Sequence, residues 1–353
     1  MVARLRDGII AKGYIVAGKG LVVAIVGATG AVGEQMLEVL DERNFPVERI
    51  VPLASARSAG SVIQWRGRSI TVEELTNESF AGVDLALFSA GASISETFGP
   101  IAVEAGTVVV DNSRAFRMVP QIPLVVPEVN AHALEGEVKL VANPNCSTIQ
   151  VVAALAPLHA AAGLKRVIFS SYQSASGAGR EAMDELRDQA VALLNFASPP
   201  VKQFQRRLAF DVLPQIDRFE ADGFTREEHK MIFETRKIME LPELAVSATC
   251  VRVPVFVGHA VSVNAEFERP IDVETARKVL AEAEGIELHE GYESYPTTAD
   301  VVGTDPVHIG RVRRDPSVEN GLVLWVVADN LRKGAATNAV QIAERLLSAG
   351  RWS

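Results

Sequence analysis

Cysteine is scarce in this chain, with two in 353 residues, at Cys146 and Cys250. Two cysteines are too few for a disulfide framework, and neither belongs to a spacing typical of zinc sites. Low cysteine usage without disulfides is usual in reducing compartments. We therefore expect a cytoplasmic protein whose functional site holds no metal.

Long apolar runs and excess positive charge are also missing. No stretch approaches the ~18 apolar residues that a membrane-spanning helix needs. The formal net charge is −9, and a surface of that sign repels nucleic-acid phosphates and anionic lipids. We expect neither nucleic acid nor membrane as a partner. An anionic substrate would need a local cationic pocket.

Hydrophobic residues are plentiful, at 48%, which is enough for two domains with buried cores. The first strong element is a β-branched run at 21–26, followed by helical spacing over 30–40. Further apolar runs lie at 49–53, 83–88, 108–110 and 123–126. Strands that alternate with helices predict a doubly wound parallel sheet of the Rossmann type.

The pattern changes near Asn143. Strands with alternating polarity are expected at 167–173, 249–256, 260–268 and 322–328, and helices at 147–159, 179–196, 226–240 and 334–347. Alternation predicts a mixed sheet that is open on one face or used in an interface. The expected fold class is α/β, with an α+β catalytic and dimerisation domain after the dinucleotide-binding domain. Residues 1–19 lack the features of a signal peptide and are expected to be a poorly ordered extension. The alternative is that the true start of the protein lies further along the sequence.

A glycine-rich turn joins the first strand to the first helix. It contains the candidate cofactor-binding residues Gly27, Thr29, Gly30, Ala31, Val32 and Gly33. Glycines permit a tight turn and the close approach of a pyrophosphate, and the helix start supplies free N–H donors. The spacing is a variant of the usual dinucleotide fingerprint, and its place between strand and helix strengthens it.

The end of the second strand indicates which dinucleotide is bound. An NAD site usually has an acidic residue there, but this chain has Ser55, Arg57 and Ser58. An arginine flanked by hydroxyls suits the 2′-phosphate of NADP(H). The alternative is a solvated loop with a chance arginine, and we favour NADP(H).

Cys146 stands in a polar segment, residues 143–148, that begins a helix. A cysteine at a helix N-terminus lies at the positive end of the helix dipole, which favours the reactive thiolate. The alternative for a lone cysteine is a buried structural role. Cys250 fits that alternative, because it lies within an apolar strand.

Other polar residues could converge on Cys146. Arg114 follows a buried strand, Glu227 and Lys230 share a helix face, and Arg252 and His259 lie near strand ends. Each has a simpler explanation, such as a surface ion pair or a hydrogen-bonded core histidine. Together they suit a phosphorylated amino-acid substrate, because arginine binds carboxylates, glutamate pairs with an ammonium, and histidine transfers protons.

With these motifs, the chain resembles the aspartate-semialdehyde dehydrogenases from about residue 21 to the C-terminus. The segments that carry the likeness are 27–33, 111–114, 143–148, 172–179, 227–230, 252–259 and 330–335. The resemblance implies that the last helix returns to the first domain. The expected domains are then 20–142 with 335–353 for the dinucleotide, and 143–334 for catalysis and dimerisation.

The resemblance also implies roles. Cys146 would be the nucleophile, His259 the acid/base, and Gln173 the residue that orients the acyl intermediate. Substrate contacts would come from Arg114, Glu227, Lys230, Arg252 and Asn145, and nicotinamide contacts from Ser176, Gly177 and Asn330. The implied reaction is the NADPH-dependent reduction of L-aspartyl-4-phosphate to the semialdehyde, with release of phosphate, in the biosynthesis of lysine, threonine, methionine and isoleucine. A homodimer or homotetramer is implied as well.

Three alternatives stay open at this point. An N-acetyl-γ-glutamyl-phosphate reductase would share the cysteine chemistry, but its substrate has no free ammonium for Glu227. A phosphorylating glyceraldehyde-type dehydrogenase would need sugar-phosphate ligands. A non-enzymatic NADP-binding regulator should have lost one of Cys146, Gln173, Arg252 or His259, and all four are present.

Overall fold

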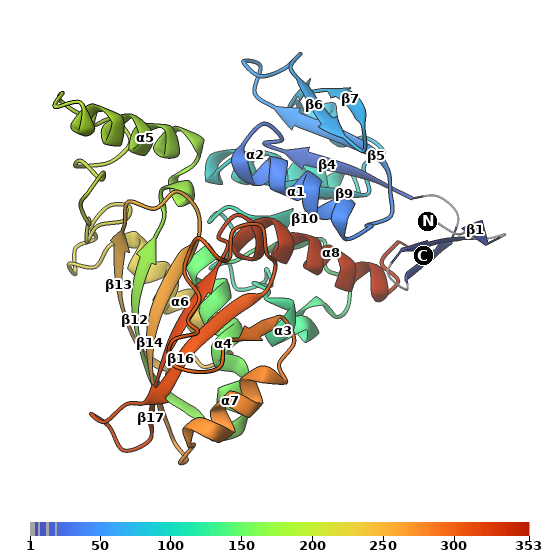
Figure 1. Ribbon diagram of the computed structural model, residues 1–353. Coiled ribbons are helices and arrows are strands. Elements are labelled where there is room, and N and C mark those ends of the chain that lie inside the picture. The colour runs from blue at the N-terminus through green and yellow to red at the C-terminus, as the bar shows by residue number, and fades with distance from the viewer. Residues whose placement is uncertain (1–3, 6–7, 12–13, 18–19, 353) are drawn as a thin grey trace. The chain divides into compact units, whose positions relative to one another are not determined.

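The computed structural model describes residues 4–5, 8–11, 14–17 and 20–352 (Figure 1). The chain divides into two units. One runs through Pro144 and resumes at Ala335, and the other is Asn145–Gly334. The second unit therefore begins two residues later than the expected Asn143. Among the described residues, no helix has the length and apolar content needed to cross a membrane.

The segment expected to be a poorly ordered extension contains three antiparallel strands among its described residues. They are β1 (Arg4–Leu5), β2 (Gly8–Ala11) and β3 (Tyr14–Ala17). The remaining residues of 1–19 lie outside the described part of the chain.

The first unit is built on a six-stranded parallel sheet, as the alternating strands and helices predicted. Its order is β11-β10-β9-β4-β5-β8. The strands are β4 (Leu21–Val26), β5 (Val47–Ala54), β8 (Glu73–Glu74), β9 (Leu85–Phe88), β10 (Val108–Asp111) and β11 (Leu140–Ala142). A separate hairpin joins β6 (Val62–Trp65) to β7 (Arg68–Thr71).

Helices cover both faces of this parallel sheet. Successive side chains of β9 point to opposite faces: Leu85 and Leu87 pack with helices α1 (Ala31–Glu42) and α8 (Thr337–Ser348), while Ala86 and Phe88 join a second core beside α2 (Ala92–Glu104). Smaller elements are the 3₁₀ turns η1 (Asn77–Phe80) and η2 (Ala131–Leu134) and the short helix α3 (Pro127–Asn130). Both faces are apolar, which explains the uninterrupted hydrophobic runs in the sequence.

One predicted strand of the first unit is wrong. The run 123–126 forms only an isolated bridge, between Leu124 and Ala142, and the strand at this edge is β11. Pro123 begins the run and Pro127 follows it, and proline has no N–H to donate to a ladder.

The second unit has a mixed sheet, as predicted. Its order is β13-β12-β14-β17-β16-β15. The strands are β12 (Leu164–Gln173), β13 (Ala245–Arg252), β14 (His259–Phe267), β15 (Ile286–Leu288), β16 (Val307–Arg314) and β17 (Gly321–Ala328). The helices are α4 (Cys146–Ala162), α5 (Arg180–Leu194), α6 (Arg226–Ile238) and α7 (Val273–Ala281), with the 3₁₀ turn η3 (Ala175–Ala178). The π-helix η4 (Arg332–Ala336) begins in this unit, and its last two residues belong to the first.

Helices cover one face of the mixed sheet. Helix α4 contacts β12, β14, β16 and β17, and α6 contacts β13. On the other face, Ser170, Ser262 and Trp325 are neighbours across β12, β14 and β17, and each is partly exposed. This arrangement explains the alternating polarity of these strands.

Candidate active site

The glycine turn of the first unit forms one wall of a cavity of about 420 Å³. The cavity lies beyond the carboxyl ends of β4, β5 and β9, where open α/β sheets bind ligands. Of the predicted cofactor-binding residues, the lining includes Gly27, Thr29, Gly30, Ser55, Arg57 and Ser58. It also includes Glu74, Leu75, Ser89, Ala90, Ile94 and Phe98, which the sequence analysis did not identify.

Two glycines of the turn are required by space. Gly27 has φ +90°, and a Cβ there would lie 2.6 Å from the carbonyl oxygen of Ser89. A Cβ at Gly33 would lie 2.3 Å from the carbonyl oxygen of Gly27. Gly33 therefore allows α1 to approach the strand, while Ala31 and Val32 form the first turn of that helix.

Arg114 also belongs to the first unit, beyond the end of β10. Asp111 stabilises the preceding turn, because its carboxylate accepts hydrogen bonds from Ser95 Oγ at 2.6 Å and Ser113 Oγ at 2.7 Å. Burial raises the pKa of Asp111, and these hydrogen bonds oppose the rise. Arg114 itself is exposed, so its guanidinium can reach an anionic ligand.

Cys146 is the first residue of α4 and is partly exposed. Asn145 caps this helix, because its Oδ1 accepts from the backbone N–H groups of Ser147 at 3.0 Å and Thr148 at 3.2 Å. The same side chain donates from Nδ2 to Glu227 Oε1 at 2.8 Å. The cap therefore fixes both the start of the helix and a buried carboxylate beside it.

Glu227 is the centre of a buried charged cluster. It accepts from Lys230 Nζ at 2.9 Å and from Gln173 Nε2 at 3.3 Å. Burial by itself would raise the pKa of Glu227, but Lys230, the hydrogen bonds and Arg252 outweigh it and lower the pKa to about 2. Glu227 is therefore a carboxylate at neutral pH and can bind a cation.

Arg252 ends β13 and is almost fully buried. Burial lowers its pKa, while Glu227 and the neighbouring sulfur of Cys146 act in the opposite direction. Its Nη1 donates to the carbonyl oxygen of Ser174 at 2.6 Å. A charged guanidinium thus lies close to Cys146, where it can bind the carboxylate of a ligand.

His259 begins β14 and is fully buried. Its Nδ1 accepts from the backbone N–H of Ser174 at 3.1 Å, so a neutral ring carries its proton on Nε2. Burial, followed by the charge of Arg252, lowers its pKa to about 3. Nε2 has no hydrogen-bond partner among the described residues, so a proton donor is available to a ligand.

The three residues expected near the nicotinamide lie beside this histidine. Asn330 Oδ1 accepts from Ser176 Oγ at 3.0 Å and from the backbone N–H of Gly258 at 2.9 Å. A Cβ at Gly177 would lie 3.0 Å from both Arg252 Nη1 and His259 Nε2. The lack of a side chain at Gly177 leaves this space free.

Cys146 is connected to the same group through Gly334. A Cβ at Gly334 would lie 2.9 Å from Cys146 Cβ and 3.5 Å from Asn330 Cβ. The second unit thus brings together all the predicted residues that it contains. Four further residues were not predicted as site residues, because their roles depend on tertiary contacts. Ser174 bonds to His259, Glu234 to the backbone N–H of Asn145, Asp217 to Lys230, and Gly334 packs against Cys146.

Cys250 differs from Cys146, as predicted. It is fully buried in β13, and burial raises the pKa of its thiol above the usual range. A buried thiol of this kind is inert.

Comparison with known proteins adds independent information. Two family models match the chain: the semialdehyde dehydrogenase NAD-binding domain over residues 22–137 and the semialdehyde dehydrogenase dimerisation domain over 155–333. A relative from Aquifex aeolicus, an aspartate-semialdehyde dehydrogenase, is 51% identical over 337 residues, which cover 94% of this chain and 99% of the relative.

Solved structures agree with the sequence relatives. The crystal structure of aspartate semialdehyde dehydrogenase II from Vibrio cholerae is similar with a TM-score of 0.92 and 50% identity, covering 94% of this chain and 99% of that one. The Candida albicans aspartate semialdehyde dehydrogenase with NADP has a TM-score of 0.73 and 25% identity, covering 93% and 98%.

Proposed function

Since the chain belongs to the aspartate-semialdehyde dehydrogenase family, we propose that it converts L-aspartyl-4-phosphate to L-aspartate 4-semialdehyde through a thioester on Cys146. The observation that carries this proposal is the position of Cys146 at the capped start of α4, beside a buried arginine and a histidine with an unpaired Nε2. The step belongs to the synthesis of lysine, threonine, methionine and isoleucine.

Each end of the substrate has a candidate partner. The Arg252 guanidinium is suited to the α-carboxylate, and the Glu227 carboxylate to the ammonium. Arg114 and Lys230 are the candidate phosphate ligands. A substrate with an acylated amino group, as in the N-acetyl-γ-glutamyl-phosphate reductases, would leave the charge of Glu227 without a partner.

The chemistry starts at the sulfur. The Cys146 thiolate attacks the acyl carbon, a C–S bond forms, and the C–O bond to phosphate breaks. NADPH, when bound, would supply the hydride that reduces the thioester carbon. His259 Nε2–H then donates a hydrogen bond to the oxygen of the thiohemiacetal that forms on Cys146, and the C–S bond breaks to release the aldehyde. Gln173, held by Glu227 and Ser171, is positioned to orient the acyl group.

NADP(H) is the proposed dinucleotide. The cavity fits it, because the glycine turn leaves space for a pyrophosphate and Arg57 lies in the lining. Arg57, Ser55 and Ser58 would hold the 2′-phosphate. Ser176, Gly177 and Asn330 are the candidate contacts of the nicotinamide end.

We also propose a homodimer that uses the open face of the mixed sheet. The dimerisation-domain match covers this sheet, and the partly exposed Ser170, Ser262 and Trp325 are neighbours on that face. Two such dimers would form the homotetramer that the family resemblance implies.

The test of the reaction is Cys146→Ala and Cys146→Ser, with Cys250→Ala as the control that removes the other thiol. Phosphate-dependent NADP reduction is measured with aspartate semialdehyde and, in parallel, with N-acetylglutamate semialdehyde. We expect roughly a 1,000-fold or greater loss of turnover in both Cys146 variants, because the covalent route is closed. Near-normal turnover in Cys146→Ala would disprove the thioester mechanism.

The same assay separates the substrates. Preference for aspartate semialdehyde supports the role of Glu227 in binding an ammonium. Preference for the N-acetylated compound would reject the substrate assignment while leaving the cysteine chemistry intact.

A further inference from the structure

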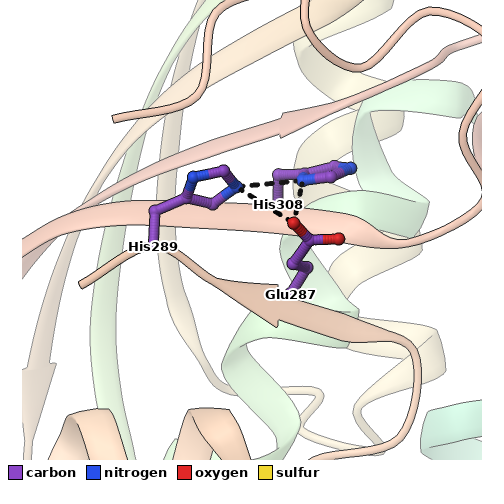
Figure 2. Close-up of side chains that lie close together, drawn as sticks. All are labelled: Glu287, His289 and His308. Atoms are coloured by element: carbon purple, nitrogen blue, oxygen red, sulfur yellow. Dashed lines mark hydrogen bonds and ion pairs between the residues drawn. The ribbon is translucent and has the colours of Figure 1, made fainter. Parts of the chain in front are cut away.

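Three potential metal ligands converge at the edge of the second unit's sheet: Glu287 on β15, His308 on β16, and His289 directly after β15 (Figure 2). His289 Nε2 lies 3.0 Å from His308 Nδ1, and Glu287 Oε1 lies 3.7 Å from each of these nitrogens. None of the three residues takes part in the proposed reaction. The cluster therefore needs an explanation of its own.

Strand register explains how the three side chains meet. Glu287 pairs with His308 in the parallel ladder of β15 and β16, so both project from the same face. His289 is two residues beyond Glu287, and its backbone N–H still bonds to the carbonyl oxygen of Ile309 at 2.8 Å. Its side chain therefore points to the same side as that of Glu287.

Thr304 determines which nitrogen of His308 carries the proton. Thr304 Oγ1 donates its only hydroxyl hydrogen to the carbonyl oxygen of Val301, at 2.8 Å. At 2.9 Å from His308 Nε2, the same oxygen must then accept from an Nε2–H. In the neutral ring the lone pair of Nδ1 therefore points toward His289 and Glu287, ready to bind an ion.

The distances match those of a metal site. A triangle with sides of 3.0, 3.7 and 3.7 Å has a circumradius of about 2.0 Å, which is close to Zn–N and Zn–O bond lengths. We propose that Glu287, His289 and His308 bind a divalent transition-metal ion of the Zn²⁺ type, with water completing the coordination. Two imidazoles and one carboxylate disfavour Ca²⁺ and Mg²⁺, which prefer oxygen ligands.

The ion would join the two ends of the segment 289–308. This segment packs on strands that carry the active site: the Gly303 backbone N–H donates to Asp329 Oδ2 at 2.9 Å, and a Cβ at Gly258 would lie 2.7 Å from the carbonyl oxygen of Thr298. Gly258 directly precedes His259. The metal thus stabilises a loop that packs against Gly258, next to the proposed acid/base His259. The metal itself takes no part in the chemistry.

No metal was expected from the sequence, because neither cysteine belongs to a spacing typical of zinc sites. His289 and His308 are nineteen positions apart, and only the pairing of β15 with β16 brings them together. A carboxylate and a histidine two apart on a strand are too common to indicate a site by themselves.

The test is a Zn²⁺ titration of tag-free, metal-depleted protein in competition with a chromophoric chelator. The variants are His289→Gln and Glu287→Gln, with exposed His132→Gln as the control histidine and Cys146→Ser to remove the reactive thiol as a ligand. We expect one equivalent to bind to the wild type, His132→Gln and Cys146→Ser. Binding should weaken at least 100-fold in His289→Gln.

Two results would overturn the site. One is an ion that is lost in Cys146→Ser and retained in His289→Gln, which would place it at the nucleophile. The other is a wild type that fails to compete with the chelator. Thermal unfolding with and without Zn²⁺ checks the same point, because an ion that binds the folded state raises the Tm of the wild type but not of His289→Gln.

Thr304 supplies a second, independent check. Thr304→Val cannot accept from His308 Nε2–H, and the loss of such a partner typically weakens metal affinity 10–100-fold. Thr304→Ser keeps the hydroxyl and should bind Zn²⁺ as the wild type does. Equal affinity of the valine and serine variants would contradict the proton assignment on which the site depends.

Discussion

At the scale of single residues, the site depends on buried polar groups whose protonation is set by their neighbours. Ser174 fixes the ring of His259 through Nδ1, and Lys230 keeps Glu227 ionised. His259 Nε2 is buried without a partner among the described residues. A buried, unpaired donor costs about 1–3 kcal/mol, so it is a source of instability that a bound ligand can relieve.

The lowered pKa of His259 predicts how stability depends on pH. The unfolded ring binds a proton below about pH 6.5, but the folded ring does not until about pH 3. Stability should therefore fall as pH decreases through this window, by about 1.4 kcal/mol per pH unit from this group. We expect His259→Asn to show a smaller slope between pH 6.5 and 4.5 in urea unfolding.

The window is chosen to exclude Glu227, whose contribution is present above its unfolded pKa and is lost only as pH falls from about 4.5 to about 2. An unaltered slope in His259→Asn would mean that the folded ring accepts a proton near its ordinary pKa.

Substitutions of Arg57 and Glu74, which have opposite charges, should change the affinity of the cofactor cavity for NADP in different ways. Arg57→Ala should weaken NADP binding about 10–100-fold, the value of a hydrogen bond to a charged group, and leave NAD nearly unchanged. Glu74→Gln removes a negative charge from the same lining, so NADP binding should not weaken. Fluorescence titration with both dinucleotides measures this, and equal losses for both in Arg57→Ala would reject the 2′-phosphate assignment.

Sequence could identify some of these residues and not others. Cys146 was visible because asparagine and proline before an apolar helix mark a helix start. Glu74 was not, because it reaches the cavity only through the pairing of β8 with β5, and a two-residue strand leaves no pattern. Ser174 was missed as the partner of His259 because that contact joins the residue after β12 to the start of β14, across 85 positions.

At the scale of elements, the ends of helices and strands position the site. Helix α4 begins at the nucleophile, while Gln173 and Arg252 end the paired strands β12 and β13 at the same register. The apolar interior of these elements was predictable from periodicity. The edge strand β15 and its neighbour β16 were not predicted, since β15 is short and the alternation in β16 is interrupted by a register shift.

A substitution at Gly334 tests how closely the π-helix η4 must approach α4. In Gly334→Ala the new methyl would lie 2.9 Å from Cys146 Cβ and 3.3 Å from its Cα, and backbone cannot yield as a flexible side chain does. We expect turnover to fall at least 10-fold with NADP affinity unchanged, because a displacement of about 1 Å can cost 100-fold.

Gly99→Ala is the matched control within a helix. Its methyl would meet the ring of Phe116 at 3.1 Å, and a side chain can adjust. Steady-state kinetics of both variants suffice. A Gly334→Ala enzyme with wild-type turnover would show that Cys146 tolerates movement.

At the scale of the whole molecule, the open face of the mixed sheet is the surface assigned to the proposed homodimer. Its central strands carry small and aromatic side chains, and the tilted rings of Tyr172 and Trp325 lie 5.6 Å apart between centroids. The period-2 pattern of these strands predicted the open face, but periodicity alone cannot identify its partner.

Ser262→Arg tests the proposed dimer. Ser262 lies in the middle of β14 on the open face, and a buried, unpaired charge there would oppose association. Light scattering should change from twice the chain mass of 37.9 kDa toward the single value. Ser69→Arg, on exposed β7 of the first unit, should leave the mass unchanged, and a Ser262→Arg protein that remains dimeric would exclude this face.

The return of α8 to the first unit has a consequence for biosynthesis of the chain. Buried residues of this helix, such as Val340 and Ile342, complete the core around β4 and β9. Because α8 follows Asn145–Gly334 in the chain, the Rossmann unit still lacks this helix when every residue of that segment has already left the ribosome. The unit that is second in sequence can therefore fold first, and a nascent chain stalled before α8 would expose an apolar surface to chaperones.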